Sequence, residues 1–457
     1  MLDWDTERLS RAIAARDLSP VDLMSETLAR IEEVNPALNA IVSLDDPDRL
    51  MARAKAAEAE APRGWLHGIP VAVKDLANAA GFPTSMGSPA FAGQIAATSD
   101  IAIARMEAAG AIVIGKTNTP EFGLGSHTYN PVHGPTQNAI LPGRSAGGSS
   151  GGAAVALASG MLSVADGSDM MGSLRNPAGW NGVYGMRPSW GRVPSEPLGE
   201  MFWSTLSTNG PMARSPGDLA RLLDTMSGPD PRQPHGWDAA EVAGRLDVDL
   251  SGRRIAWLGD WGGALPMEEG VLTHTRAALE RLASLGVQIE EIAPPFSREA
   301  LWQSWTVLRS FAVSQSLGLL YDTRADVLKP EAIWEIERGR SFTVIDLQKA
   351  SAIRSDWFRT ARRLFETFDA LALPTAQCWP FPVEIDWPKE IDGTTMDTYH
   401  RWMEVVICAS LIGLPAAAVP CAPDAEGRPI GVQIIGAPRG DLAVLQIASG
   451  WHRCAPS

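Results

Sequence analysis

Three short stretches of the sequence combine residue types that could carry chemistry. Residues 164–180, VADGSDMMGSLRNPAGW, place two serines and two aspartates in a loop of small residues, and such a loop exposes backbone N–H groups. Residues 110–117, GAIVIGKT, fit the phosphate-loop pattern G-x-x-x-x-G-K-[ST]. Residues 147–151, GGSSG, fit the G-x-S-x-G pattern that surrounds the nucleophilic serine of α/β-hydrolases.

The phosphate-loop match is interpreted as a false positive. A phosphate loop follows a strand and turns its amides inward, but the four intervening residues here are Ala, Ile, Val and Ile, which predict a strand. Asn118-Thr119-Pro120 follows where a helix should begin. We therefore expect no nucleotide here, and we expect Lys116 to lie at a strand end, in solvent or in a salt bridge.

The G-x-S-x-G match makes Ser149 the nucleophile of a Ser-His-Asp esterase, and this alternative stays open. An acid and then a histidine must follow the serine in the chain. The later histidines sit in no glycine-rich or otherwise distinctive loop, and they are His235, His274, His400 and His452. The preceding residues, LPGRSA, are not the apolar strand that such a turn requires.

A further set of stretches covers most of residues 60 to 440 in a fixed order. They are PVAVKDL, IVIGKTNTPEF, GGSSGGAAVALASG, GSDMMGSLRNPAGWNGVYGMRPSWGRVP, NGPMARS, LALPTAQ, LIGLPAAAVP and GVQIIG. Together they resemble the landmarks of the amidase signature family. So many matches in the family's order make the resemblance specific.

The resemblance implies a catalytic triad of Lys74, Ser149 and Ser173. Ser173 would be the nucleophile, Lys74 the base, and Ser149 the bridging serine, which in the family follows a cis peptide bond. A serine hydroxyl attacks well only when a base removes its proton. Lysine has a pKa of about 10.4 in water, but burial can lower it by several units. Lys74 follows the apolar residues Val71-Ala72-Val73, which suits burial.

The loop before Ser173 is expected to form an oxyanion hole, because acyl transfer creates an oxyanion that preorganised N–H groups must meet. The backbone groups expected to form it are those of Met170, Met171, Gly172 and Ser173. Asp169 and Arg175 flank the loop, and we expect them to brace it rather than to touch substrate.

The two methionines depart from the family's common pattern, glycine-threonine-aspartate-threonine-glycine-glycine-serine. Backbone amides survive this change, but the side-chain environment does not. We expect Met171 to lie beside the acyl pocket and Met170 to pack in the core. Gly125 and Ser126 are further expected to line the substrate pocket.

Strands that alternate with helices must position these residues. Ser19-Pro20 predicts the start of a helix that ends at Asn35-Pro36. Helices are also predicted over 100–110 and 151–159 and from about Leu174, with strands over 71–73, 111–114 and 162–165. This alternation predicts an α/β fold with a mixed, largely buried sheet. The resemblance implies that this sheet belongs to a single large amidase-signature domain, in which helices cover both faces of the sheet.

The domain is expected to have four segments. Residues 1–60 form a helical N-terminal preface, and residues 61–228 form the catalytic core. Residues 229–370 form a variable, tryptophan-rich region on the substrate side, and residues 371–457 return into the core sheet. Most tryptophans of the C-terminal half are expected in the core, while others are candidates for lining an aromatic pocket.

Composition narrows the function classes. The net charge is −14, from 39 basic and 53 acidic residues, which argues against a nucleic-acid surface. The acidic N-terminus MLDWDTERLS is unlike a signal peptide, and no run approaches about 20 apolar residues, so we expect no membrane span and a cytoplasmic location. The four cysteines lack metal-ligand spacing and are expected to be free thiols.

We therefore expect a hydrolase that cleaves C–N bonds through an acyl-enzyme on Ser173, without metal or organic cofactor. The expected substrate is a small, uncharged amide, anilide or carbamate ester, and the expected assembly is a monomer or homodimer. Family members also serve as glutamine-dependent transamidation subunits, and that alternative stays open. The intact Lys–Ser–Ser set argues against a non-catalytic binding protein.

Overall fold

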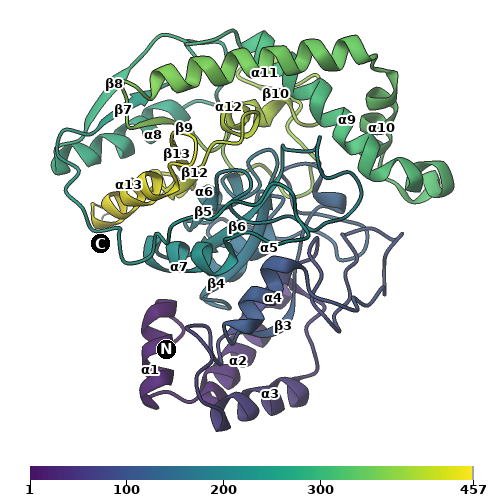
Figure 1. Cartoon of the computed structure of the whole chain (residues 1–457), viewed down its shortest axis with the longest axis vertical. Helices are drawn as coiled ribbons and strands as arrows, with labels where there is room; N and C mark the ends of the chain where they lie inside the picture. Colours follow the sequence, from purple (N-terminus) through teal and green to yellow (C-terminus); the bar gives the residue numbers. More distant parts are fainter. Residues whose placement is uncertain (455–457) are drawn as a thin grey trace.

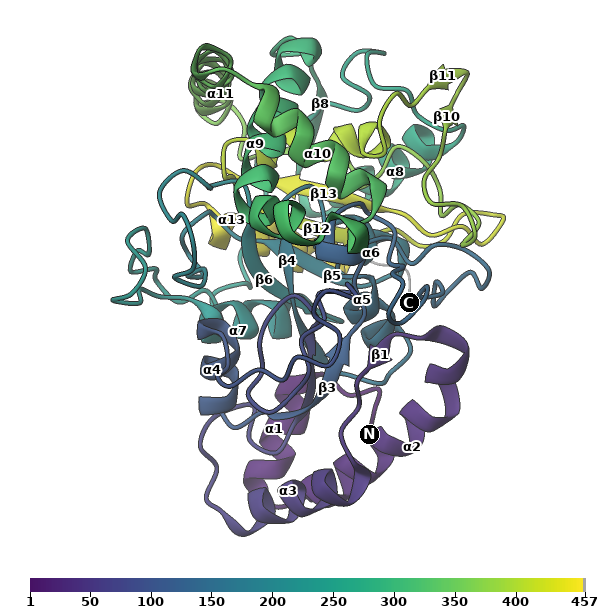
Figure 2. The same cartoon turned by 90° about the vertical axis from the view of Figure 1, so that its right-hand side faces the viewer.

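An eight-stranded mixed sheet forms the centre of the computed structural model, which describes residues 1–454 (Figures 1 and 2). Within residues 1–454 the strands of this and the smaller sheets are, in chain order, β1 (Ile41–Val42), β2 (Pro70–Lys74), β3 (Ile112–Thr117), β4 (Val164–Asp169), β5 (Tyr184–Arg187), β6 (Thr208–Ala213), β7 (Arg254–Trp257), β8 (Gln288–Glu291), β9 (Ala370–Pro374), β10 (Glu390–Ile391), β11 (Thr394–Thr395), β12 (Ala416–Pro420) and β13 (Gly431–Ile435).

The helices cover the sheet and extend beyond it at both ends of the molecule. They are α1 (Thr6–Ala15), α2 (Pro20–Leu38), α3 (Pro47–Ala59), α4 (Ile101–Ala108), α5 (Gly151–Ala158), α6 (Asn176–Trp180), α7 (Pro216–Met226), α8 (Val271–Glu280), α9 (Arg298–Arg324), α10 (Pro330–Ser341), α11 (Val344–Leu364), α12 (Ile407–Ser410) and α13 (Asp441–Arg453). In Figure 1, α1–α3 lie at one end of the molecule and α9–α11 at the other.

The central sheet runs in the order β4-β6-β5-β12-β13-β9-β7-β8. Pairs from β4 to β9 are antiparallel, whereas β7 pairs in parallel with both β9 and β8. Its inner strands are buried along most of their length, as expected for a sheet with helices on both faces. The predicted mixed α/β fold is thus confirmed.

A second sheet of three strands, in the order β1-β3-β2, carries Lys74 at the end of β2. The strand predicted from the failed phosphate-loop match is β3, and it runs through Gly115, Lys116 and Thr117. Lys116 is buried there, with Nζ 3.8 Å from Asp75 Oδ1, so the salt-bridge environment is the one realised.

Several predicted boundaries move, as two examples show. Helix α2 begins after its Ser19 cap as expected but passes through Pro36 to Leu38. Proline removes a single donor near the helix end, and the helix stops instead at Asn39, whose left-handed backbone (φ 52°) lets its N–H reach the Asn35 carbonyl. Strand β4 continues past residue 165 to Asp169, because β6 pairs with it along its whole length.

No helix within residues 1–454 is long and apolar enough to span a membrane.

Candidate active site

Lys74 ends β2 with its side chain enclosed in the protein and its amine surrounded by hydroxyls. Its Nζ lies 2.8 Å from both Ser149 Oγ and Ser150 Oγ, and 3.1 Å from Ser168 Oγ. The side chain is 1% exposed, and no carboxylate lies within 4 Å of Nζ in the described part of the chain. The amine therefore has hydrogen-bond partners but no counter-ion in contact.

Burial lowers the pKa of Lys74 to about 7, because the charged form loses its hydration. The more distant carboxylates of Asp166 and Asp169 oppose this shift without cancelling it. Asp75, the neighbour in sequence, accepts hydrogen bonds from Ser85 and pairs with Lys116. A substantial share of Lys74 is thus neutral near pH 7.

Strand β4 supplies two of the groups around Lys74. Asp166 Oδ1 accepts a 3.0 Å hydrogen bond from the Lys74 amide, and Ser168 Oγ contacts Nζ. Alternate residues of a strand share one face, so Asp166 and Ser168 point together toward β2, while Asp169 points to the opposite face. Burial raises the pKa of Asp166 to about 6.

Ser149 lies in the loop before α5 and follows a cis peptide bond from Gly148. The glycines of this loop are required by packing. A Cβ on Gly152 would lie 2.3 Å from the Asn118 amide nitrogen, and one on Gly147 would lie 2.3 Å from Asn176 Oδ1. The loop therefore fits closely against β3 on one side and the start of α6 on the other.

Ser173 lies against this loop, since the Ser150 amide donates to the Ser173 carbonyl at 3.3 Å. The Ser173 side chain is 6% exposed. The structure thus brings together the segments that carry Lys74, Ser149 and Ser173, which are far apart in sequence.

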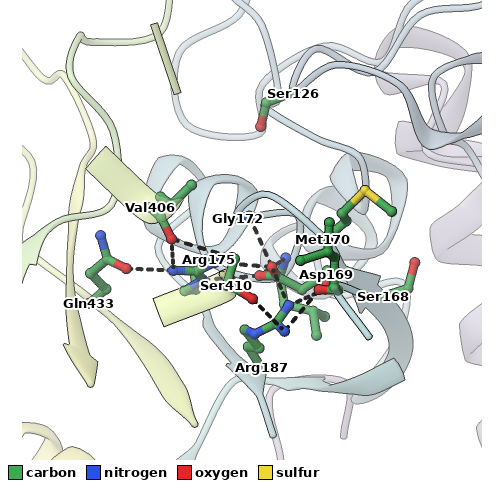
Figure 3. A network of polar contacts seen from close by, with 12 residues as sticks. Ser126, Ser168, Asp169, Met170, Gly172, Arg175, Arg187, Val406, Ser410 and Gln433 are labelled. Atoms are coloured by element: carbon green, nitrogen blue, oxygen red, sulfur yellow. Dashed lines mark hydrogen bonds and ion pairs between the residues drawn. The ribbon is translucent and has the colours of Figure 1, made fainter. Parts of the chain in front are cut away.

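The loop that ends at Ser173 is braced by Asp169 (Figure 3). Both carboxylate oxygens of Asp169 accept from Arg175, at 3.0 Å each, and Arg187 lies 3.3 Å away. Arg175 also donates to the Val406 carbonyl and to Gln433 Oε1. Burial alone would raise the pKa of Asp169, but the two guanidinium groups hold it well below its usual range. The cluster ties the loop to η4 (Arg401–Val406) and to β13.

The Asp169 carboxylate accepts a hydrogen bond from one of the amides that we expected in the oxyanion hole. The Gly172 amide donates to Asp169 Oδ1 at 2.9 Å, so it is engaged by the protein itself. The amides of Met170, Met171 and Ser173 have no hydrogen-bond partner within residues 1–454. Gly172 keeps a conformational role, because its φ is 82° and a Cβ there would lie 2.9 Å from Val406.

The two methionines differ in burial, and Met171, which we expected beside the acyl pocket, is the more buried of the two. Met171 is 3% exposed and belongs to the hydrophobic core. Met170 is partly buried and packs against this core, and its Sδ lies 3.5 Å from Arg309 Nη1. In Figure 3 its side chain points away from Arg187 and toward the side on which Ser126 lies. Arg309, from a distant helix, supplies a contact for Met170 that the local sequence does not reveal.

Gly125 and Ser126 line a narrow cavity together with Tyr399 and Trp402. Ser126 Oγ donates to the carbonyl of Gly148, which precedes Ser149 in the chain. This cavity therefore borders the loop that carries Ser149. A second cavity, of about 520 Å³, lies between α9, α10 and α11 and is lined by none of the three expected catalytic residues.

A family model described as Amidase matches residues 22–445. The chain belongs to the amidase signature family. An acylamidase from Rhodococcus erythropolis is 33% identical over 100% of this chain and 96% of its own length. A glutamyl-tRNA(Gln) amidotransferase component from Chloroflexus aurantiacus is also 33% identical, over 97% of this chain and 94% of its own length.

Among solved structures, a bacterial aryl acylamidase of the amidase signature family superposes with a TM-score of 0.91 at 26% identity, covering 99% of this chain and 96% of that one. The similarity to amidase signature enzymes is therefore one of sequence and of fold, over essentially the whole chain. The chain is an amidase signature hydrolase with the character of an acylamidase.

The geometry of this amidase also bears on the Ser-His-Asp alternative. The partner of the Ser149 hydroxyl is Lys74, and no histidine within residues 1–454 hydrogen-bonds to Ser149 or Ser173. His127, which precedes the serine loop in sequence, bonds instead to Ser145. Ser149 lacks the base that an esterase of that class requires.

Sequence reasoning missed several groups of the site, namely Ser150, Asp166, Ser168 and Arg187. Two of them, Asp166 and Ser168, could have been found, because they stand two residues apart in the stretch VADGSD, which continues the predicted strand. Arg187 lacks any local signal and is identified only by its contact with Asp169.

Proposed function

We propose that this amidase hydrolyses small, uncharged amides through an acyl-enzyme on Ser173, with neutral Lys74 as the base and Ser149 as the proton relay. The observation that carries the proposal is the 2.8 Å contact between Lys74 Nζ and Ser149 Oγ in a buried site where no described carboxylate contacts the amine. A lysine in such a site can lose its proton near neutral pH.

The hydroxyls around Lys74 give its amine a consistent hydrogen-bond arrangement. A neutral amine has two N–H groups and one lone pair. Ser150 and Ser168 can accept the two N–H groups, since both oxygens lie within 3.1 Å of Nζ. The lone pair is then left for the hydroxyl proton of Ser149, the third neighbour of Nζ.

In the proposed reaction, Ser173 Oγ attacks the amide carbonyl carbon while its proton passes to Ser149, whose own proton passes to Lys74. The C–N bond then breaks, and the leaving amine takes the proton back along the same route. Water repeats the attack on the acyl-Ser173 ester and releases the carboxylic acid. The steps alternately remove and return a proton, so they need a group whose pKa lies near the working pH, which Lys74 supplies.

The amides of Met170, Met171 and Ser173 are proposed to hold the developing oxyanion. Among the residues described they are free of other hydrogen bonds, and Asp169 fixes the turn that carries them. Donors already in place cost no reorganisation when the charge forms, and each is typically worth about 10²–10³ in kcat.

Anilides and alkyl amides are the proposed substrates, in keeping with the acylamidase and aryl acylamidase relatives. A carbamate ester carries the same carbonyl carbon and is included as a proposed substrate class. An uncharged substrate suits a site in which neutral hydroxyls and a partly apolar loop surround the proposed reacting groups. We also retain a cytoplasmic location and a monomer or homodimer as predictions.

A combined hydrolysis and labelling experiment tests the proposal. Aryl amides, aliphatic amides and aryl carbamates are incubated with the chain alone, and products are identified by mass spectrometry. A sulfonyl fluoride probe followed by peptide mapping then locates the reactive serine, with Ser173→Ala as the matched control. We expect acid and amine products and a label on the Ser173 peptide that the control loses.

Two outcomes contradict the proposal in different ways. A label confined to Ser149 makes that residue the nucleophile. Hydrolysis of glutamine only, and only with partner proteins, supports the transamidation role that the amidotransferase relative's name indicates for that protein.

A further inference from the structure

Arg309, in the middle of α9, is a buried guanidinium beside the Ser173 loop. Its side chain is 3% exposed. Its Nε donates to Glu335 Oε1 at 2.6 Å, and its Nη2 donates to the Tyr399 hydroxyl at 2.7 Å. The charge is therefore balanced by Glu335, and two of the three nitrogens have strong acceptors.

The third nitrogen, Nη1, has only a weak partner. Within residues 1–454 its one hydrogen-bond contact is Met170 Sδ at 3.5 Å. A thioether is a weak acceptor, and Nη1 carries two N–H groups. A buried donor on a charged group that lacks a good acceptor is unfavourable, so a stronger acceptor at this position would bind well.

This nitrogen contacts the loop that leads to Ser173. Met170 stands three residues before Ser173, and its amide is one of the proposed oxyanion donors. Tyr399, which accepts from Nη2, lines the narrow cavity that also contains Gly125 and Ser126. Arg309 thus contacts two residues of the proposed site, Met170 through its thioether and Tyr399 through its hydroxyl.

We propose that Arg309 Nη1 is a substrate-binding donor that takes a second, neutral hydrogen-bond acceptor of the substrate in place of the Met170 thioether. Methionine is unbranched and flexible, so its side chain can move aside. The acceptor is neutral because Glu335 already balances the guanidinium, and a substrate carboxylate would add an unpaired negative charge beside it.

The inference rests on the proposed function and names a substrate class for it. Preferred amides carry an ether or carbonyl oxygen close to the scissile bond, in the acyl or the amine part. Arg309 Nη1 is the group that selects substrates with this oxygen. When no substrate is bound, Nη1 contacts the Met170 thioether.

Two isosteric substrate pairs test this inference. Methoxyacetanilide and butyranilide differ by an oxygen for a methylene in the acyl part, and 2-methoxyethyl and butyl amides of one acid differ in the same way in the amine part. The measured quantity is the ratio of kcat/KM, ether over methylene, in wild type, Met170→Leu and Met170→Gln. Comparing this ratio between proteins cancels the intrinsic reactivity of each substrate.

Met170→Gln places an amide oxygen within reach of Nη1, so it should compete with the substrate acceptor and lower the ratio about tenfold for at least one pair. Met170→Leu keeps the size but offers no acceptor, so the ratio should stay at the wild-type value or rise. Neither variant removes the partner of Glu335, and melting temperatures verify that both fold.

Ratios that agree within about twofold among the three proteins, for both pairs, would overturn the role of Arg309 while leaving the proposed amidase activity intact. The same holds if Met170→Leu lowers the ratio as much as Met170→Gln does. A wild-type protein that hydrolyses none of the four amides would overturn both proposals.

Discussion

Two lysines on adjacent strands of one small sheet have the same burial and different surroundings. In the parallel pair β2–β3, Val73 faces Lys116 and Lys74 faces Thr117, so the two lysines are one register position apart. Both side chains are at most 1% exposed. Their differences therefore come from their neighbours and not from burial.

Lys116 has a nearby carboxylate, and Lys74 has none within 4 Å among the residues described. Lys116 Nζ lies near Asp75, the Ala77 carbonyl and the Thr84 hydroxyl, a set typical of a structural ammonium ion. Burial lowers the pKa of both lysines, but Asp75 opposes the shift at Lys116. Burial alone would make both lysines candidate bases. Of the two, only Lys74 has hydroxyls in place of a counter-ion in the described part of the chain, and this difference makes it the candidate.

Exchanging each lysine for arginine should separate the two roles with the largest effect. Arginine keeps the charge but cannot deprotonate at usable pH. Lys74→Arg should lower kcat by about 10²–10⁴, the usual contribution of a general base, whereas Lys116→Arg should retain activity within about tenfold. Turnover is normalised to folded protein. Near-normal turnover of Lys74→Arg would end the assignment of Lys74 as the base.

Replacing each lysine by methionine should affect the free energy of unfolding in the opposite order, with the larger loss at Lys116. Lys116→Met leaves Asp75 buried without its cation, which should lower the free energy of unfolding by about 3–5 kcal/mol. Adding Asp75→Asn should restore much of the loss. Lys74→Met leaves no contacting carboxylate unpaired and should not destabilise the protein. Urea unfolding of the four proteins measures this, and equal losses for both methionine variants would contradict the comparison.

The hydroxyls around Lys74 should contribute smaller amounts. Ser168→Ala removes one acceptor of the amine, and a hydrogen bond of about 0.5–1.5 kcal/mol corresponds to a two- to tenfold loss of kcat/KM. Ser159→Ala is the control, since that hydroxyl donates to the Val155 carbonyl at the end of α5. If both variants behave alike in the amidase assay, Ser168 does not position the amine.

Local patterns were sufficient for the mixed α/β fold class and for the elements that carry Lys74 and Ser149. The strand that ends at Lys74 and the glycine-rich loop around Ser149 have signals within a few residues, as does the Ser19 cap of α2. Such elements depend on neighbours in sequence, so a single sequence is enough to predict them.

The details of the Ser173 loop depend instead on long-range contacts. Met170 contacts Arg309, which is 139 residues away in sequence, so its surroundings do not follow from the local pattern. The Gly172 amide is taken by a side chain only three residues away, but the turn that permits it is fixed by Arg175 and its distant partners. No local pattern encodes the distant partners of Met170 and Arg175.

The pH dependence of kcat/KM for a neutral anilide tests the central claim most directly, because this quantity reports the ionisation of the free enzyme. Neutral Lys74 is the proposed active form, so kcat/KM should fall about tenfold per pH unit below about 7 and level off above it. Asp166 raises the pKa of Lys74, so Asp166→Asn should move the midpoint to lower pH. A profile that is flat from about pH 5 to about pH 9, or a midpoint that Asp166→Asn moves upward, would contradict the account.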